Sequence, residues 1–412
     1  MKGKICYKRM LWISRFFIIT LLMPLTQVQA DTTFGKDVRV DDIGVYNLHD
    51  YPCITVDEVG NVYVAWQDRR SRNYDIYFTK SADGGYSFGP NVRVNDVWPG
   101  NQTTPAIAVD ANGDIYLVWC DTRNGRRNPD LYFAKSTDGG VSFGPNVRVD
   151  DTGSFHSSQL FPSIAVDSIG NIYVVWYDNR NGNCDIYFAA STNGGASFSS
   201  NVRVDDTGEN ISAQANPVIA VDASGDIYVV WHDKRNKDFD IYFAKSTDGG
   251  YSFGANAMVS HGRRDQLGPA VGVDAAGNIY VAWHDCRRKD YDIYFAKSTD
   301  GGDTFEEDIR VDDTGKSIGY QHSPAMAVRP NGTVYVAWHD ERNGNYDIYA
   351  TKSADGGSSF MPNVRVDDMV RSTCEQTKAA IAVSTTGSVY VVWRDCRDGN
   401  LGIYFSKGTF TP

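Results

Sequence analysis

The chain has 412 residues and a formal net charge of −11, and nearly all of its acidic residues are aspartate. Phosphate backbones and anionic membranes repel such a surface, which excludes nucleic acid as a partner. Aspartate favours turns and caps, and no long segment has helical periodicity, so the composition favours a turn-rich β protein.

The N-terminus predicts a secretory signal over residues 1–30. A basic start precedes the apolar run Phe16–Leu25, and small residues end at Ala30. Neither this run nor any later one is long enough to span a bilayer. Cleavage before Asp31 would remove five basic residues and take the net charge from −11 to −16. We therefore expect a secreted or otherwise extracytoplasmic protein, in the periplasm or on the cell surface.

Seven similar units follow the predicted signal, and the second of them spans Pro105–Asp151. The anchor of each unit is a W-x-D-x-R motif, and successive tryptophans lie 52 to 57 residues apart. A period near 50 residues in short β segments predicts a propeller. The motifs are Trp66/Asp68/Arg70, Trp119/Asp121/Arg123, Trp176/Asp178/Arg180, Trp231/Asp233/Arg235, Trp283/Asp285/Arg287, Trp338/Asp340/Arg342 and Trp393/Asp395/Arg397.

Each unit reads as four short strands, which in the second unit are PAIAV, IYLVW, LYFAKS and NVRV. The seventh unit ends after its third strand, whereas the segment Phe34–Asp42 reads as a fourth strand with no unit before it. The N-terminal strand would thus complete the last blade. We predict an all-β fold: one domain over residues 31–412, a seven-bladed β-propeller of four-stranded antiparallel blades closed by that strand.

A turn of the form S-x-D-G-G-x-x-F joins the third and fourth strands in five units, and a sixth unit has asparagine in place of the aspartate. It resembles the Asp-box of the bacterial neuraminidase repeat, found in sialidases and other secreted propellers. The resemblance implies a structural turn at the blade periphery, and its central residues are Asp83, Asp138, Asn193, Asp248, Asp300 and Asp355. Such an aspartate can accept backbone N–H bonds within the turn, and the two glycines permit positive φ. For the W-x-D-x-R motif we also favour a structural over a catalytic role.

The opposite face of the ring should carry the variable loops, where binding residues usually lie. In five units a glutamine stands three residues before the proline of the first strand, and Gln376 and His49 hold that place in the other two. These side chains could ring the channel mouth, or they could satisfy backbone groups there. Trp98 adds an aromatic surface for a sugar ring. The ligand candidates are Trp98, Gln102, Gln159, Gln214, Gln266, Gln321, Gln376, His49, Tyr320, Arg264 and Glu375.

The resemblance to sialidases also implies an arginine triad, a tyrosine nucleophile activated by glutamate, an aspartate as acid/base, an Arg-Ile-Pro motif and six blades. This chain has no Arg-Ile-Pro and seven units, so no catalytic residue is carried over. An enzyme would have to draw on other loop-face residues. The candidates are Tyr51, Tyr320, Glu209, Glu375, Arg263, Arg264 and Arg371.

Near-identical repeats suit additive or axial binding better than catalysis, which needs unlike groups. We therefore favour a non-catalytic, monomeric propeller that binds carbohydrate or another extracellular ligand. The alternatives are a sialidase-like exo-glycosidase and a protein-docking module of an envelope complex. We expect no cofactor, although aspartate pairs after the fourth strands could bind Ca²⁺; solvated turns are the favoured reading. These pairs are Asp150-Asp151, Asp205-Asp206, Asp312-Asp313 and Asp367-Asp368.

Six cysteines follow the signal, and the sequence leaves their fifteen possible pairings open, with one pair feasible. Folding the first two strands of the seventh unit around Thr386 brings Cys374 close to Cys396. A disulfide there would hold Glu375 and Gln376 in place. The remaining cysteines are Cys53, Cys120, Cys184 and Cys286.

Overall fold

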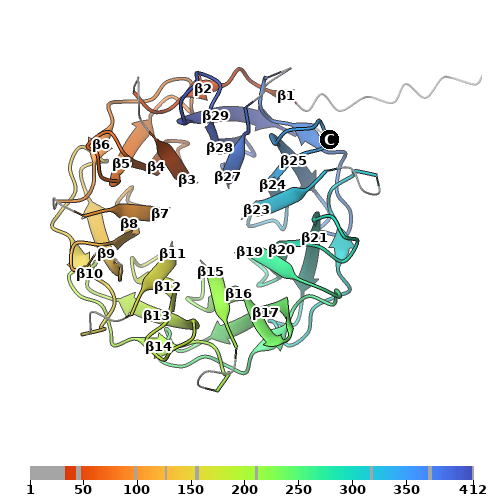
Figure 1. Cartoon of the computed structure of the whole chain (residues 1–412), viewed down its shortest axis with the longest axis horizontal. Helices are drawn as coiled ribbons and strands as arrows, with labels where there is room; N and C mark the ends of the chain where they lie inside the picture. Colours follow the sequence, from red (N-terminus) through yellow and green to blue (C-terminus); the bar gives the residue numbers. More distant parts are fainter. Residues whose placement is uncertain are drawn as a thin grey trace, which may run out of the picture.

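The computed structural model describes residues 33–42, 48–96, 100–125, 128–153, 157–208, 212–315, 319–369 and 374–410. The predicted signal over residues 1–30 lies outside this part of the chain. Seven antiparallel sheets stand in a ring around a central axis (Figure 1). Six of the sheets have four strands and the seventh has five, and no helix occurs among the described residues. The prediction of an all-β, seven-bladed propeller is confirmed.

Every blade runs from an innermost strand to a short outer strand. The innermost strands are β3 (His49–Val56), β7 (Gln102–Val109), β11 (Gln159–Val166), β15 (Gln214–Val221), β19 (Gln266–Val273), β23 (Gln321–Val328) and β27 (Thr377–Val383). The second strands are β4 (Val62–Asp68), β8 (Ile115–Asp121), β12 (Ile172–Asp178), β16 (Ile227–Asn236), β20 (Ile279–Asp285), β24 (Val334–Asp340) and β28 (Val389–Asp395). The third strands are β5 (Asp75–Ser81), β9 (Asp130–Ser136), β13 (Asp185–Ser191), β17 (Asp238–Ser246), β21 (Asp292–Ser298), β25 (Asp347–Ser353) and β29 (Gly402–Thr409). The outer strands of blades 1 to 6 are β6 (Val92–Arg93), β10 (Val147–Arg148), β14 (Val202–Arg203), β18 (Ala257–Met258), β22 (Ile309–Arg310) and β26 (Val364–Arg365).

The N-terminal segment closes the ring by completing blade 7. β2 (Val38–Arg39) pairs with β29 as the outer strand, and β1 (Thr33–Phe34) pairs further along it (Figure 1). Asp37 and Asp368 exchange backbone-to-carboxylate hydrogen bonds of 3.3 and 3.0 Å across this seam. The same exchange joins ordinary neighbours, for example Asp151 and Asn201 at 3.0 and 2.9 Å. The predicted closure is therefore confirmed.

The hydrophobic core lies between the blades. Successive side chains of a strand point to opposite faces, so Tyr116 and Val118 of β8 pack against blade 3, whereas Trp119 packs against blade 1. Seven such clusters fill the seven gaps, and the tryptophan of each W-x-D-x-R motif is fully buried. A single blade could not cover both of its faces, and the ring supplies a neighbour for each.

The W-x-D-x-R motif forms a buried hydrogen-bonded unit near the end of each second strand. In blade 3, the fully buried Asp178 accepts bonds from the Trp176 indole at 3.2 Å and from the Arg180 guanidinium at 2.6 Å. The guanidinium also lies 4.1 Å from the ring centroid of Tyr187. A buried carboxylate is tolerated only when it is paired and hydrogen-bonded. These contacts give the motif's arginine a structural role. We call the buried hydrogen-bonded residues that the blades share, such as those of this motif, the framework.

The second strands are longer than the sequence pattern predicts, because the pattern ended each of them at the motif's tryptophan. This prediction is corrected: every second strand continues to the motif's aspartate, which pairs with the third strand, as Asp178 does with Asp185. In blade 4, β16 continues further to Asn236, and Asp233 pairs with Asp240 of β17 inside the sheet. Asp233 nevertheless accepts the Trp231 indole N–H at 3.2 Å and the Arg235 guanidinium at 2.7 Å. The longer strand therefore leaves the bonds of the motif unchanged.

The Asp-box turns hold neighbouring blades together at the opposite end. Asp138 accepts the Ser142 backbone N–H at 3.0 Å and the Ser142 hydroxyl at 2.6 Å, and these bonds lower the pKa of its carboxyl. A Cβ atom on Gly140 would meet the ring of Phe78 in the preceding blade at 2.2 Å. Phe143 packs against the same ring, with centroids 5.3 Å apart. The turn thus docks onto the blade before it.

Candidate functional site

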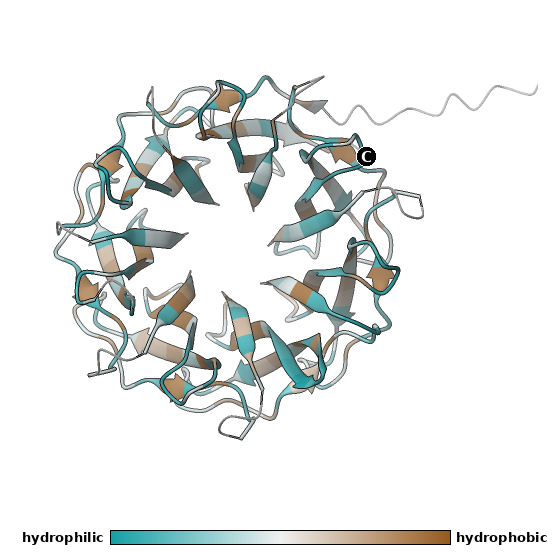
Figure 2. Ribbon diagram, viewed as in Figure 1, coloured by the Kyte–Doolittle hydropathy of each residue, from teal (hydrophilic) through white to brown (hydrophobic). Residues whose placement is uncertain are grey.

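A cavity of about 320 Å³ opens at the loop-face end of the central channel. Each innermost strand contributes the residue that precedes its proline, or Ala379 in blade 7. We call this set the mouth ring: Tyr51, Thr104, Phe161, Asn216, Gly268, Ser323 and Lys378. The mixture of hydrophilic and hydrophobic residues along the innermost strands differs from blade to blade (Figure 2).

All seven members of the mouth ring adopt the left-handed conformation, with φ between 49° and 59°. Each lies at a register shift between its innermost strand and the second strand, as at Leu160/Ser163 in blade 3. A left-handed non-glycine residue costs on the order of 1 kcal/mol, and such strain tends to gather at functional sites. The bulge turns these residues toward the channel.

The bulge is supported by an acceptor from the preceding blade. The backbone N–H of Thr104 donates to the Gln67 side chain at 3.0 Å. At the same place, Gly268 donates to His232 Nδ1 and Ser323 to His284 Nδ1, each at 3.4 Å. Gln67, His232 and His284 are all the variable residue between Trp and Asp of the W-x-D-x-R motif. That variable position therefore helps to shape the mouth.

Aromatic rings and one lysine gather on one side of the mouth. Tyr51 and Phe161 meet edge to face with ring centroids 6.0 Å apart, although they come from blades 1 and 3. Phe161 stacks on Tyr177 at 5.9 Å, and Lys378 Nζ lies 4.6 Å from the Tyr51 ring centroid. This side offers flat apolar faces beside a cationic donor, which suits a ring-shaped ligand with polar substituents.

A second group lies where blades 5 and 6 meet, and we call it the His–Tyr cluster. Its members are His284, Tyr291, Tyr320, His322, His339 and Tyr346. The central ring is His322, with centroids 4.6 Å from Tyr291, 5.2 Å from His284 and 5.6 Å from His339. Tyr320 is 42% exposed and stacks on His322 at 5.8 Å. The cluster joins a buried imidazole layer to an exposed tyrosine.

The imidazoles of this cluster are neutral at physiological pH. Burial lowers the pKa of His322 to about 4 and that of His339 to about 3. Burial and the neighbouring imidazoles hold the pKa of His284 well below its usual range, and its Nδ1 accepts the Ser323 N–H. Neutral imidazoles can donate or accept a hydrogen bond without attracting a counter-ion.

The structure places the predicted glutamines away from the channel. Gln102, Gln159, Gln214, Gln266, Gln321 and Gln376 are fully buried. The Gln102 amide donates to Asp121 at 3.2 Å and accepts from Asn95 at 3.1 Å, and Gln159 donates to Asp178 at 3.2 Å. His49, also fully buried, lies between Asp41 and Asp68 at 3.1 and 3.4 Å. Of the two roles considered for these residues, a ring around the mouth is corrected, since their side chains are buried in the framework. The alternative role of satisfying backbone groups is seen at Gln321 and Gln376, which donate to the carbonyls of Gly319 and Cys374.

The other predicted ligand and catalytic candidates are dispersed. Tyr51 lies in the mouth ring and Tyr320 in the His–Tyr cluster, whereas Arg263, Arg264 and Glu375 are exposed on loops. Trp98, Glu209 and Arg371 lie outside the described residues. Of the mouth ring, the sequence reasoning named only Tyr51 and missed Thr104, Phe161, Asn216, Gly268, Ser323 and Lys378. Their shared position before the first-strand proline, or before Ala379, was the available signal.

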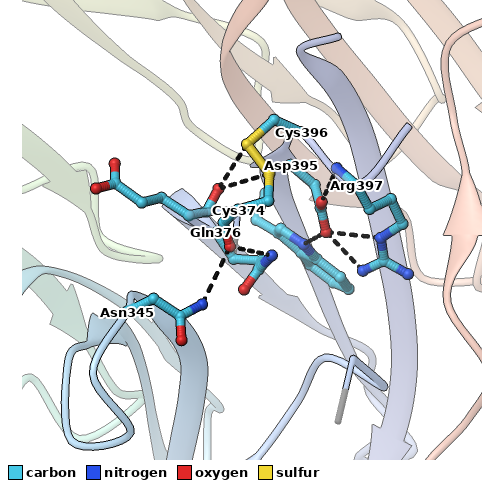
Figure 3. The surroundings of a disulfide bond; sticks show 8 residues. Asn345, Cys374, Gln376, Asp395, Cys396 and Arg397 are labelled. Atoms are coloured by element: carbon cyan, nitrogen blue, oxygen red, sulfur yellow. Dashed lines mark hydrogen bonds and ion pairs between the residues drawn. A yellow bond between two sulfur atoms is a disulfide. The ribbon is translucent and has the colours of Figure 1, made fainter. Parts of the chain in front are cut away.

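Cys374 and Cys396 form a disulfide at the top of blade 7 (Figure 3). The Cys374 carbonyl accepts from Gln376 Nε2 at 2.9 Å and from Asn345 Nδ2 at 3.1 Å, so the loop is joined to blade 6. The remaining described cysteines, Cys53, Cys120, Cys184 and Cys286, are free thiols.

The aspartate pairs considered for Ca²⁺ serve as hydrogen-bond acceptors of the framework. Asp150 binds Arg148 at 2.7 Å and the Leu131 N–H at 2.9 Å, and Asp151 binds Arg180 at 2.9 Å. Within the described ranges, no three His, Cys, Asp or Glu side chains are grouped to hold a metal ion. The same ranges contain no helix with the length and apolarity to cross a bilayer.

The model of the BNR repeat-containing family matches residues 26–255, more than half of the chain. The chain belongs to this family. No curated protein matches the sequence of this BNR propeller. The prediction of an Asp-box propeller is thereby confirmed.

Solved structures share the fold at low sequence identity. An ulvan lyase matches at 13% identity with a TM-score of 0.60, covering 91% of this chain and 95% of its own. The alpha-L-arabinofuranosidase of Fusarium graminearum matches at 12% identity with a TM-score of 0.58, and the match covers 78% of this chain and 98% of the arabinofuranosidase. A sialidase of Streptococcus pneumoniae matches at 12% identity with a TM-score of 0.50, and the match covers 90% of this chain and 70% of the sialidase.

Proposed function

We propose that this BNR propeller is a non-catalytic protein that binds carbohydrate on its loop face, at the mouth ring and the adjoining His–Tyr cluster. One observation carries the proposal. The seven positions of the mouth ring share one backbone conformation, yet they hold seven different residue types. The tryptophan and aspartate of the framework are the same in every blade. Variable side chains on a rigid, strained support are typical of a recognition surface.

The chemistry of the two groups suits a glycan. A sugar ring has an apolar face that can stack on Tyr51, Phe161 or Tyr320, and hydroxyls that can bond to neutral imidazoles and to Lys378. Two of the solved structures with this fold are carbohydrate-active by name, an ulvan lyase and an arabinofuranosidase. At their level of identity the likeness concerns the fold, so the proposal rests on the residues of the loop face.

Glycan cleavage at the same face is the second candidate. The observation that favours it is the neutral His322, which lies beside Tyr291 and directly opposite His339 in the β23–β24 pairing. A neutral imidazole beside a phenol can accept or relay a proton. An arginine triad of the sialidase kind would need arginines beyond the W-x-D-x-R set, because each of these binds its own motif aspartate.

The test is a glycan panel incubated with purified residues 31–412 and read for retention and for cleavage products. We expect retention without products, and at least tenfold weaker retention by Tyr320→Ala. Tyr86→Ala is the matched control, because Tyr86 is 76% exposed on the Asp-box face. Products would overturn the non-catalytic proposal in favour of cleavage. Absence of both would favour a protein-docking role.

A further inference from the structure

The Asp-box end of the propeller is less uniform than its repeats suggest, and the third blade is the exception. The third strand of each of the other six blades carries a lysine, as its penultimate residue or, in blade 7, at Lys407. In five of them the ammonium lies over the tyrosine ring of the second strand, at 5.0 to 6.0 Å from the ring centroid. In blade 3 the position of this lysine is occupied by Ala190, and the equivalent tyrosine of the second strand is Tyr173.

A cavity of about 470 Å³ occupies the space beside Ala190, between blades 3 and 4. Tyr173, Phe188 and Phe198 contribute aromatic walls, and Tyr251 from the Asp-box of blade 4 stands at the edge, 85% exposed. This volume lies within the range of small-ligand pockets. The lysine side chain that extends over the ring in other blades is replaced here by a methyl group.

Two further positions around the cavity are uncharged in blade 3. In blade 2, Lys135 pairs with Asp114 at 2.7 Å, and in blade 4 Lys245 pairs with Asp226 at 2.7 Å. Asn171 holds the place of these carboxylates in blade 3, as Asn61 and Asn278 do in blades 1 and 5. The central Asp-box residue of blade 3 is Asn193, whereas the other five boxes have aspartate. None of the residues that line the cavity is charged.

The exchange of aspartate for asparagine also changes the hydrogen bonding of the turn. In the Asp-box of blade 2, the Ser142 hydroxyl donates to Asp138 at 2.6 Å. In blade 3 the direction is reversed, and Asn193 Nδ2 donates to the Ser197 hydroxyl oxygen at 2.8 Å. The Ser197 proton is therefore available to an acceptor outside the turn. Ser197, Ser199 and Ser200 all line the cavity, so hydroxyl donors and acceptors face its aromatic walls.

We propose that the cavity beside Ala190 is a second binding site, which takes a neutral pyranose unit. The aromatic walls suit the apolar face of the sugar, and the serine hydroxyls and asparagine amides suit its hydroxyl groups. The absence of charge around the cavity disfavours an ionic ligand, because a buried charge needs a partner. This site lies on the opposite end of the molecule from the mouth ring and does not depend on the proposed function of the loop face.

The chain itself offers the substitution that tests the site. Ala190→Lys restores the residue that the fold accommodates in six other blades, so it fills the cavity without disturbing the framework. Tyr251→Ala removes an exposed ring that contributes little to stability. Asn193→Asp restores the repeat's own carboxylate and returns the serine proton to the turn. Thermal unfolding would check that each variant folds as the parent does.

Binding is measured by saturation-transfer NMR with the methyl glycosides of glucose, galactose and mannose, and with glucuronate as the charged comparison. We expect a signal with at least one neutral glycoside, a loss of at least tenfold in affinity in Ala190→Lys and Tyr251→Ala, and a smaller loss in Asn193→Asp. Tyr320→Ala should retain the signal, which separates this site from the loop face. No signal, an unchanged signal in folded Ala190→Lys, or equal binding of glucuronate would overturn the proposal.

Discussion

Asp178 at the end of β12 and Phe161 near the start of β11 lie in the same blade, but they relate differently to the other blades. Asp178 is fully buried and has an identical counterpart in all seven motifs. Phe161 is half-buried in the channel mouth, and each of its six counterparts is a different residue. The propeller thus combines a framework that tolerates little variation with a mouth whose side chains are exchanged freely on an unchanged backbone.

The largest expected effect comes from breaking the framework. Asp178→Ala leaves the Trp176 indole, the Arg180 guanidinium and the Gln159 amide without their shared acceptor. We expect a loss of about 3–5 kcal/mol in the free energy of unfolding, because three donors lose one buried acceptor and Arg180 keeps only its ion pair with the exposed Asp151. Phe161→Ala should cost only about 1 kcal/mol, since its ring is half-buried at the mouth. Urea unfolding of both variants measures the contrast, and similar losses would contradict the division between framework and mouth.

Acid should destabilise the protein through the buried histidines of the loop face. Burial lowers the pKa of His232 to about 4 and that of His339 to about 3, below the value of 6.5 for an unfolded histidine. Between the folded and the unfolded pKa of such a histidine, the unfolded state binds more protons than the folded state. The free energy of unfolding therefore falls as the pH drops from 7 toward 4. We expect each such histidine to contribute about 2 kcal/mol to the loss between pH 7 and pH 5.

His284→Gln sharpens this prediction, because Gln67 occupies the same position in blade 1 and accepts the same kind of backbone N–H. Urea unfolding at several pH values should show a smaller loss on acidification for this variant than for the parent protein. An unchanged pH dependence would mean that buried imidazoles do not control the acid response. His261→Gln is the control, because it removes a histidine from the exposed surface and none from the buried layer.

The sequence predicted the framework far better than the mouth. The motif period, the incomplete seventh unit and the extra N-terminal strand were enough for seven blades and their closure. The residues at the mouth are placed there by a bulge in each innermost strand. The residue types threonine and phenylalanine, at Thr104 and Phe161, do not predict the left-handed conformation that this bulge requires. A regular strand without the bulge would direct the glutamines toward the channel, which is why they were predicted to lie there. The His–Tyr cluster likewise joins Tyr291, His322 and His339, which meet only through strand pairing and blade contact.

A smaller effect is expected at the closure. Asp37 stands where five other blades have asparagine, and burial together with the neighbouring Asp368 raises the pKa of its carboxyl to about 7. A folded pKa above the unfolded value of 3.8 stabilises the protein at low pH, and this contribution is lost as the pH rises toward 7. Asp37→Asn should therefore raise the free energy of unfolding more at pH 8 than at pH 4. Lower stability at pH 8 would show that the charged pair with Arg397 matters more than burial.

The smallest expected effect concerns the strain of the mouth itself. Ser323 has a φ of 51°, and Gly268 already holds the equivalent position in blade 5. Ser323→Gly would relieve about 1 kcal/mol of backbone strain. Glycine also raises the conformational entropy of the unfolded state, which costs somewhat less than that, so the free energy of unfolding should rise by about 0.5 kcal/mol. Ser163→Gly, in the extended part of β11, should instead lose about 1 kcal/mol. If Ser323→Gly is stabilising, the residues of the mouth ring are kept at the expense of stability, as a recognition surface requires; if it is destabilising, the mouth belongs to the framework after all.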